Sequence, residues 1–322
     1  IAFYSDLASH LYAPHDFNYN RFKSGGILAL WGLFKKLVIA DRAVAMVKLV
    51  AGNYSDFKGT YILMAVCMYA IQLYADFSGG IDICRGFAEM LGITMAQNFR
   101  QPYFSRSLTE YWHRWHITLG EWLRIYLFYP ISISKPFLKM GKQLKKHGLK
   151  HLGKVLPTSI ASLITFIVIG VWHGAAWTFV LWGLWFAVLL LLEKLALLPV
   201  LEKHRVFGHV YTLFFVTLGF VLFDADSAAQ AVSRIGAMFG AGGLPLSSAQ
   251  AVYYLKSYGP LLVLGILCAT PLPKMIVAKL RKSKGAATAL DVLEPLCVLI
   301  PLLLGTAFLV DGSFNPFLYF RF

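Results

Sequence analysis

Residues 155–192 read VLPTSIASLITFIVIGVWHGAAWTFVLWGLWFAVLLLL, and this stretch decides the class of fold. It contains two apolar segments, Val155–Trp172 and Ala175–Leu192, separated only by His173 and Gly174. Each segment has 18 residues, close to the roughly 20 that a helix needs to cross a bilayer. Since backbone polar groups in lipid must be hydrogen-bonded internally, the stretch predicts a pair of membrane-spanning helices.

The composition of the whole chain agrees with that prediction. Hydrophobic residues make up 58% of it and charged residues 14%, against roughly 45–50% and 25% in soluble domains. We therefore expect an all-α fold, a polytopic transmembrane helical bundle formed by one membrane-embedded domain over residues 1–322. The remaining apolar segments bring the expected number of spans to seven, give or take one: Val206–Phe223, Val292–Val310, Gly25–Val50, Thr60–Asp82 and Ala251–Pro273.

The positive charge gathers between the apolar segments. The net charge is +14, and the loop Lys135–Lys154 alone has seven lysines, two histidines and no acidic residue. Such loops stay on the cytoplasmic side and meet anionic lipid heads or a phosphorylated donor, so we expect a multi-pass protein of the cytoplasmic membrane. Nucleic-acid binding is not expected, because the basic residues do not line one soluble face.

The segment Ser107–Tyr129 has a different pattern from the spans. Large apolar side chains recur in it at steps of three and four, which predicts one amphipathic helix at the interface or re-entering the membrane. Ser107 and Glu110 are spaced as a capping box at its start, and Pro130 fits its end. The apolar stripe consists of Leu108, Trp112, Trp115, Leu119, Trp122, Tyr126 and Tyr129.

His173 stands between two apolar segments with hardly another ionisable group nearby. An imidazole titrates near neutrality and takes a proton from an attacking hydroxyl, so His173 is a candidate general base. Polar groups at membrane depth are functional candidates by default. The alternative is a hydrogen-bonded histidine that only packs helices together or ends a hairpin, and Gly174 allows either a turn or the close approach of a ligand.

His113 and His116 lie three residues apart in the amphipathic segment, a spacing that places both on one helix surface. Two histidines so placed are able to share a metal ion, but no third ligand is apparent, so no metal site is predicted. His113 fits a solvated face. His116 lies beside the aromatic stripe, and we expect it to be buried beside a cavity.

Asp76 and Asp82 interrupt an otherwise apolar segment. A carboxylate at membrane depth costs roughly 2.5–3.5 kcal/mol unless it is paired or hydrated. Two interpretations stay open: a carboxylate paired with an arginine such as Arg85 or Arg114 to fix helix packing, or part of a polar tunnel.

Three stretches of sequence together resemble the membrane-bound O-acyltransferase family. They are YADFSG from Tyr74 to Gly79, NFRQPY from Asn98 to Tyr103, and YWHRWHITL from Tyr111 to Leu119. WHGAAW from Trp172 to Trp177 matches a second signature of that family, and the ending FLYFRF from Phe317 to Phe322 is also typical of it. The likeness runs from about Trp31 to the end of the chain, and the bacterial alginate O-acetyltransferase branch is the most similar.

The resemblance implies that His173 is the principal catalytic residue and that His116 is a second essential or tunnel-lining residue. It also implies a tunnel, and we expect the residues that line it or bind substrate to be Asp76, Ser78, Trp112, Arg114 and Trp172. The donor would be acetyl-CoA or another acyl thioester, with no bound cofactor. The acceptor would be a hydroxyl of a cell-envelope glycan or of an extracytoplasmic acetyltransferase partner.

Two departures from the family pattern bear on these expectations. Members usually carry several spans before the position of Ile1, so we expect the sequence to be truncated at its N-terminus. The Lys135–Lys154 loop is longer and more basic than in the alginate branch, and Arg124-Ile125 replaces a common Arg-Asp, so alginate is not assumed as acceptor. Two other functions stay open: D-alanyl transfer to teichoic acid from a carrier protein, and a proton-coupled transporter using Asp76 and His173.

Overall fold

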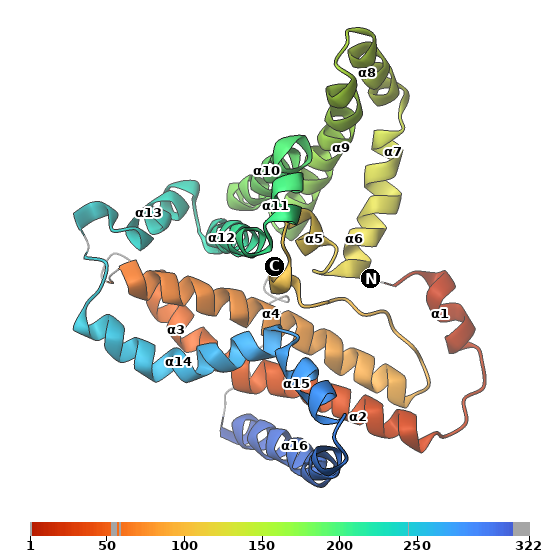
Figure 1. The fold of residues 1–322 in the computed structure, drawn as a ribbon, viewed down its shortest axis with the longest axis vertical. Coiled ribbons are helices and arrows are strands. Elements are labelled where there is room, and N and C mark those ends of the chain that lie inside the picture. The colour runs from red at the N-terminus through yellow and green to blue at the C-terminus, as the bar shows by residue number, and fades with distance from the viewer. Residues whose placement is uncertain (1, 53–56, 58, 244, 312–322) are drawn as a thin grey trace. The chain divides into compact units, whose positions relative to one another are not determined.

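The computed structural model describes residues 2–52, 57, 59–243 and 245–311, and the ending Phe317–Phe322 lies outside them. Throughout that described part the regular elements are helices, and none is a strand (Figure 1). The predicted all-α fold is therefore confirmed. The described chain forms two compact units, named here for their places in the sequence: a central unit of residues 99–243, and a flanking unit of residues 2–98 and 245–311.

The flanking unit is built on a long helix pair. The helices α2 (Tyr19–Phe34) and α4 (Gly59–Met90) pack antiparallel, and glycines let their backbones meet. A Cβ on Gly32 would lie 2.5 Å from the carbonyl oxygen of Gly79, and Gly25 faces Gly86 in the same way. Close backbone approach through small residues is how helices associate in membranes. The other elements of the unit are α1 (Tyr4–Leu11), the π-helix η1 (Lys35–Ala40), α3 (Asp41–Gly52), α14 (Ala249–Ala269), α15 (Leu272–Leu280) and α16 (Lys284–Asp311).

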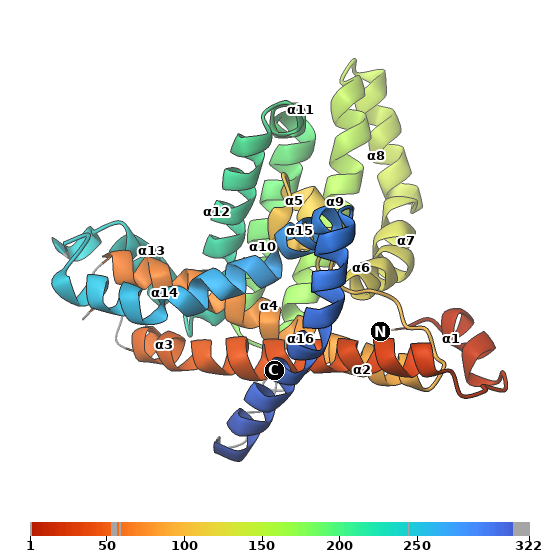
Figure 2. The same cartoon turned by 60° about the horizontal axis from the view of Figure 1, so that its bottom comes forward.

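The central unit contains the helix hairpin that the opening stretch predicts. The helices α9 (Lys150–His173) and α10 (Trp177–Leu192) pack face to face, and α12 (Arg205–Asp224) packs against α10 (Figure 2). Glycines again sit at the contact, because a side chain on Gly170 or Gly183 would strike the backbone of the opposite helix. The remaining elements are η3 (Pro102–Phe104), α5 (Leu108–Trp112), α6 (Ile117–Leu123), η4 (Arg124–Phe128), α7 (Tyr129–Ser132), α8 (Lys135–Lys146), η5 (Glu193–Leu197), α11 (Leu198–Lys203), α13 (Ala228–Met238) and η6 (Ala241–Gly243).

Six helices of the described chain are long and apolar enough to cross a membrane, within the predicted range. They coincide with six of the seven expected segments: Gly59–Met90, Lys150–His173, Trp177–Lys203, Arg205–Asp224, Ala249–Ala269 and Lys284–Val310. The seventh, Gly25–Val50, is helical through α2, η1 and α3 but is not among them, because Lys35, Lys36, Asp41 and Arg42 place too many charges inside it.

The basic segment Lys135–Lys154 is not a loop, as predicted from its composition, but a helical hairpin. It forms α8 and the first turn of α9, and the two run side by side in Figure 1. Gly141 and Gly153 meet at the contact, where a Cβ on Gly141 would lie 2.9 Å from the carbonyl oxygen of Gly153. The helical spacing of Phe137, Met140 and Leu144 does indicate a helix. The prediction of a loop rested instead on the seven lysines of the segment.

Candidate active site

The predicted single helix over Ser107–Tyr129 is broken before its third turn. The start is as predicted, because the Ser107 hydroxyl accepts a hydrogen bond from the N–H of Glu110 at 3.0 Å. α5 then ends at Trp112, and α6 begins only at Ile117. Between them His116 adopts left-handed backbone angles, φ 43° and ψ 56°, a conformation in which histidine is several-fold enriched among non-glycine residues. The second helix runs on through η4 and α7 to Ser132, so it ends two residues past Pro130, close to the predicted end.

Because of this break, His113 and His116 do not share one helix surface. His113 is exposed, as predicted, whereas His116 is buried at 9% exposure. The imidazole of His116 stacks against the ring of Phe99, with 6.5 Å between ring centroids. Burial lowers the pKa of His116 to about 3, and nearby His173 lowers it further. His116 is therefore a neutral imidazole at physiological pH, close enough to His173 for the two to interact electrostatically.

His173 ends α9 inside a shell of aromatic rings. The ring centroids of Trp172, Trp182 and Phe223 lie 5.0, 5.3 and 5.2 Å from its own. The ring of Phe179 occupies the space that a side chain on residue 174 would fill. Gly174 therefore allows the Phe179 ring to pack beside His173. These rings give the half-buried imidazole apolar surroundings on several sides, and an imidazole can take a proton from a hydroxyl.

Trp112 connects the two histidine-bearing segments of the central unit. Its ring lies edge-on to Trp182 at 5.7 Å and to Phe186 at 5.0 Å, and Trp182 in turn contacts His173. The indole Nε1 of Trp112 is buried, and no hydrogen-bond partner for it occurs among the described residues. A second set of contacting rings runs from α5 to His116 and consists of Tyr111, Trp115 and Phe99.

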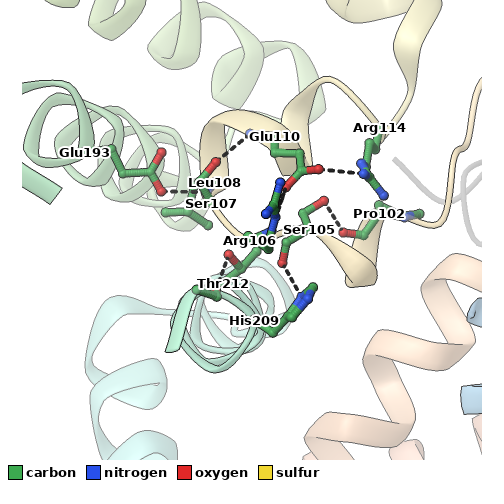
Figure 3. Close-up of polar contacts among 11 residues, drawn as sticks. Pro102, Ser105, Arg106, Ser107, Leu108, Glu110, Arg114, Glu193, His209 and Thr212 are labelled. Carbon is green, nitrogen blue, oxygen red and sulfur yellow. Dashed lines mark hydrogen bonds and ion pairs between the residues drawn. The ribbon is translucent and has the colours of Figure 1, made fainter. Parts of the chain in front are cut away.

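The other predicted site residues of the central unit are placed differently. Trp172 is 52% exposed, although its ring contacts His173. Arg114 is half-buried, and its guanidinium donates to Glu110 at 2.5 Å (Figure 3). Its backbone carbonyl accepts from the N–H of Arg100 at 3.0 Å, which joins the segment before η3 to the turn that carries His116.

Asp76 and Ser78 belong to the flanking unit, where lysines bind them. Lys36 lies 2.7 Å from Asp76 and 2.9 Å from Asp41. The interpretation of Asp76 as a paired carboxylate is therefore right in kind, but the partner is a lysine and neither Arg85 nor Arg114. No sequence pattern indicates that the two segments meet, and it is the glycine contacts of α2 with α4 that bring them together.

A second buried lysine, Lys35, lies beside Lys36 in sequence, and the two lysines with their partners form the lysine cluster of the flanking unit. Lys35 donates to the Ser78 hydroxyl at 2.9 Å and to Asp82 at 2.7 Å. Arg85 lies 3.2 Å from Asp82, as one of the predicted pairings had it. Both lysines, Asp76 and Ser78 are buried, so the charges of this cluster are balanced inside protein and not by water.

Glu193 is a buried carboxylate that the sequence analysis does not predict. It is fully buried, and one of its oxygens accepts a hydrogen bond from the N–H of Leu108 at 2.6 Å (Figure 3). The other oxygen accepts from the N–H of Thr109 at 2.9 Å and from the Thr109 hydroxyl at 2.7 Å. In the sequence it follows Ala175–Leu192 and precedes Lys194, which looks like the ordinary charged end of a span. Its only signal was that an acidic residue stands where the positive-inside pattern favours basic ones.

The central unit therefore gathers His116, His173, Trp112 and Trp172, while the lysine cluster of the flanking unit holds Asp76 and Ser78. No group of three His, Cys, Asp or Glu side chains suited to a metal ion occurs in the part of the chain that the structure describes. Two imidazoles that lie among aromatic rings in one unit are suited to proton transfer and to donating hydrogen bonds.

Comparison with known proteins agrees with these features. The model of the membrane-bound O-acyltransferase family matches residues 39–222. The "Probable alginate O-acetylase AlgI" of Azotobacter vinelandii is 30% identical over 94% of this chain and 63% of that protein. The "Peptidoglycan O-acetyltransferase" of Helicobacter pylori is 28% identical over 95% of this chain and 58% of that protein. The "Teichoic acid D-alanyltransferase" of Bacillus subtilis is 29% identical over 48% and 39%. The chain thus spans less than two thirds of the length of these relatives.

Proposed function

The chain belongs to the membrane-bound O-acyltransferase family and is a multi-pass membrane protein, and we propose that it transfers an acetyl group from a thioester to a hydroxyl. The donor would be acetyl-CoA or another acyl thioester on the cytoplasmic side of the bacterial inner membrane. The acceptor would be a cell-envelope polysaccharide or a hydroxyl of an extracytoplasmic acetyltransferase partner. The similarity to an alginate O-acetylase and a peptidoglycan O-acetyltransferase over nearly the whole chain supports this choice.

The observation that carries the proposal is the pairing of two enclosed imidazoles in one unit. In the proposed reaction the acceptor oxygen attacks the thioester carbonyl carbon while His173 takes the hydroxyl proton. The C–S bond then breaks, the acyl group stays on the acceptor oxygen, and His173 returns the proton to the thiolate, which leaves as a thiol. No step needs a metal ion or a redox partner.

His116 has the complementary part in this proposal. As a neutral imidazole it carries one N–H, which orients the thioester or donates to the oxyanion that develops on its carbonyl oxygen. A preorganised donor of this kind is worth about 10²–10³ in rate. Trp172 would line the site directly, since its ring contacts His173, and Trp112 would support it from behind, since its ring contacts Trp182, which in turn contacts His173.

D-alanyl transfer to teichoic acid is the second candidate, and one observation favours it. The Bacillus subtilis D-alanyltransferase is 29% identical to this chain, but over only 48% of it. Its donor would be an aminoacyl carrier protein, so the donor separates the two functions. The transporter alternative has no comparable observation in its favour.

The decisive experiment is a donor assay on the full-length protein reconstituted in liposomes. Labelled acetyl-CoA and a labelled D-alanyl carrier protein would be offered in turn, with envelope polysaccharide or an acetyltransferase partner as acceptor. We expect label from acetyl-CoA in an ester that mild alkali releases. Label from the carrier protein alone would establish the second function, and label from neither would reject acyl transfer.

A further inference from the structure

The contacts of α5 carry an inference that rests on the proposed function and goes beyond it. We propose that Glu193 is a positioning residue, which holds α5 so that Trp112 and His116 keep their places relative to His173. Glu193 does not touch either histidine in this proposal. It acts through the helix start that its carboxylate binds (Figure 3).

The first step is the burial of the carboxylate. An ionised carboxyl group away from water is unfavourable unless hydrogen bonds compensate it. Glu193 has that compensation in two backbone N–H donors and one hydroxyl donor, all from the first two residues of α5. Charge-assisted bonds of this kind are roughly twice as strong as neutral ones, and a helix N-terminus favours a negative charge. The group is therefore held firmly where it lies.

The second step is the nature of α5 itself. A helix of five residues is too short to be stable alone, and its first N–H groups have no partner within the helix. Glu193 binds two of those groups, and the Ser107 hydroxyl binds the N–H of Glu110. The Glu110 carboxylate in turn accepts a hydrogen bond at 2.7 Å from the N–H of Arg106, which precedes the helix. The tertiary contact from Glu193 thus fixes the beginning of an element that its own sequence does not stabilise.

The third step connects α5 to both histidines. Trp112, its last residue, packs against Trp182, and Trp182 packs against His173. The turn after Trp112 leads within four residues to His116. Glu193 directly follows α10, the helix that carries Trp182. One carboxylate therefore ties the segment that bears His116 to the helix that encloses His173.

The π-helical turn at Glu193 fits this interpretation. Residues 193–197 form η5, and a π-turn inside a helix adds a residue and so changes the direction of the side chains before and after it. Such turns are frequent at functional sites. Here the altered register coincides with the residue whose carboxylate binds α5.

The test compares three variants of the full-length protein in liposomes. Glu193→Gln keeps the size of the side chain, but its amide group meets N–H donors with only one acceptor oxygen. Thr109→Val removes one of the three hydrogen bonds and leaves the carboxylate in place. Glu202→Gln is the matched control, because Glu202 is an exposed acid on the neighbouring helix α11.

We expect Glu193→Gln to lower kcat about 10–100-fold, since misplacing a reacting group by about 1 Å costs about 10²-fold. The KM for acetyl-CoA should stay within about twofold, and the pH profile should keep its shape, because neither histidine changes. Thr109→Val should show a smaller loss of the same kind, and Glu202→Gln none. The backbone amides of Leu108 and Thr109 should exchange hydrogen faster in Glu193→Gln alone.

A kcat within threefold of wild type in Glu193→Gln, despite faster amide exchange, would overturn the inference and leave Glu193 a purely structural residue. An increase in KM with unchanged kcat would overturn it as well. If Glu193→Gln does not fold, Thr109→Val decides: a kcat below that of Glu202→Gln with an unchanged KM would support the inference, and a kcat equal to that of Glu202→Gln would overturn it. Wild-type protein that transfers no acyl group would reject the proposed function instead, and amide exchange would still report whether Glu193 holds α5.

Discussion

The two units bury polar side chains in opposite ways. In the flanking unit each buried lysine lies within 3 Å of a carboxylate, as Lys36 does with Asp76 and Lys35 with Asp82. In the central unit His116 and His173 sit among aromatic rings, and Glu193 is bound by backbone N–H groups. The first arrangement pairs each buried charge with an opposite one, whereas the second surrounds two imidazoles with aromatic rings.

This difference indicates where chemistry is expected and where it is not. Lys35 and Lys36 donate hydrogen bonds to carboxylates of another helix, so their ammonium groups are engaged in joining helices. A neutral imidazole inside an apolar shell is ready to accept a proton. We therefore expect changes in the central unit to act on rate and changes in the flanking unit to act on stability.

The largest effect should come from His173→Ala. If this residue is the general base, acyl transfer by the full-length protein should fall about 10²–10⁴-fold, while membrane insertion and the thermal unfolding midpoint stay near those of wild type. Activity should be measured with saturating acetyl-CoA in liposomes. Activity within tenfold of wild type would show that His173 is not the general base, and would contradict the expectation that changes in the central unit act on rate.

His116→Ala should come next, with a loss of about 10²–10³-fold if its N–H stabilises the developing oxyanion. His113→Ala is the matched control, since it lies three residues away but is exposed. We expect the control to retain nearly full activity. Equal losses in the two variants would point to a shared role, such as metal binding, which elemental analysis of the purified protein would decide.

In the flanking unit, Lys36→Met should lower stability rather than rate. The substitution breaks the ion pairs of Lys36 with Asp76 and Asp41, and breaking a buried pair by removing one partner costs about 3–5 kcal/mol of unfolding free energy. Arg281→Met is the control, because its pair with Asp291 is exposed and such pairs contribute about 0–1 kcal/mol. Unfolding in detergent measures both. A Lys36→Met protein of normal stability but without activity would contradict the expectation that changes in the flanking unit act on stability.

The buried histidine should also make stability depend on pH. Because the pKa of His116 is about 3 in the folded protein and about 6.5 in an unfolded chain, the unfolded state binds more protons between these values. The contribution is fully present above pH 6.5 and is lost as pH falls, by up to about 1.4 kcal/mol per pH unit. His116→Gln should flatten the profile of unfolding midpoint between pH 6.5 and 4.5. An unchanged slope would show that His116 is accessible to protons in the folded state.

The smallest effect is expected from the basic helix α8, outside both clusters. Reversing Lys135, Lys139, Lys142 and Lys146 to Glu should raise the KM for an anionic donor a few-fold at low salt and less at high salt, because exposed charges are screened over about 8–10 Å. The same reversal at Lys274, Lys279, Lys282 and Lys284 is the control. If α8 serves only as a topology signal, correctly inserted protein should keep its KM.

The helical fold could be predicted from short-range patterns alone. Apolar segments of span length predicted six helices that the structure contains, and the Ser107 cap was evident from a spacing of three residues. The histidines were singled out because polar residues are rare in such surroundings. These features follow from local chemistry, since helix formation and membrane partition depend on residues within one segment.

The tertiary structure decided which polar groups meet. Lys36 binds Asp76 across 40 residues of sequence and Glu193 binds Thr109 across 84, and neither pairing has a local signal. The break at His116 also depends on packing, because the periodic stripe around it favours an uninterrupted helix. The sequence by itself thus determined that this is a helical membrane protein with two conspicuous histidines. Only the close packing of distant helices enclosed those histidines in aromatic rings and gave each buried charge its partner, since both depend on contacts that no single segment makes.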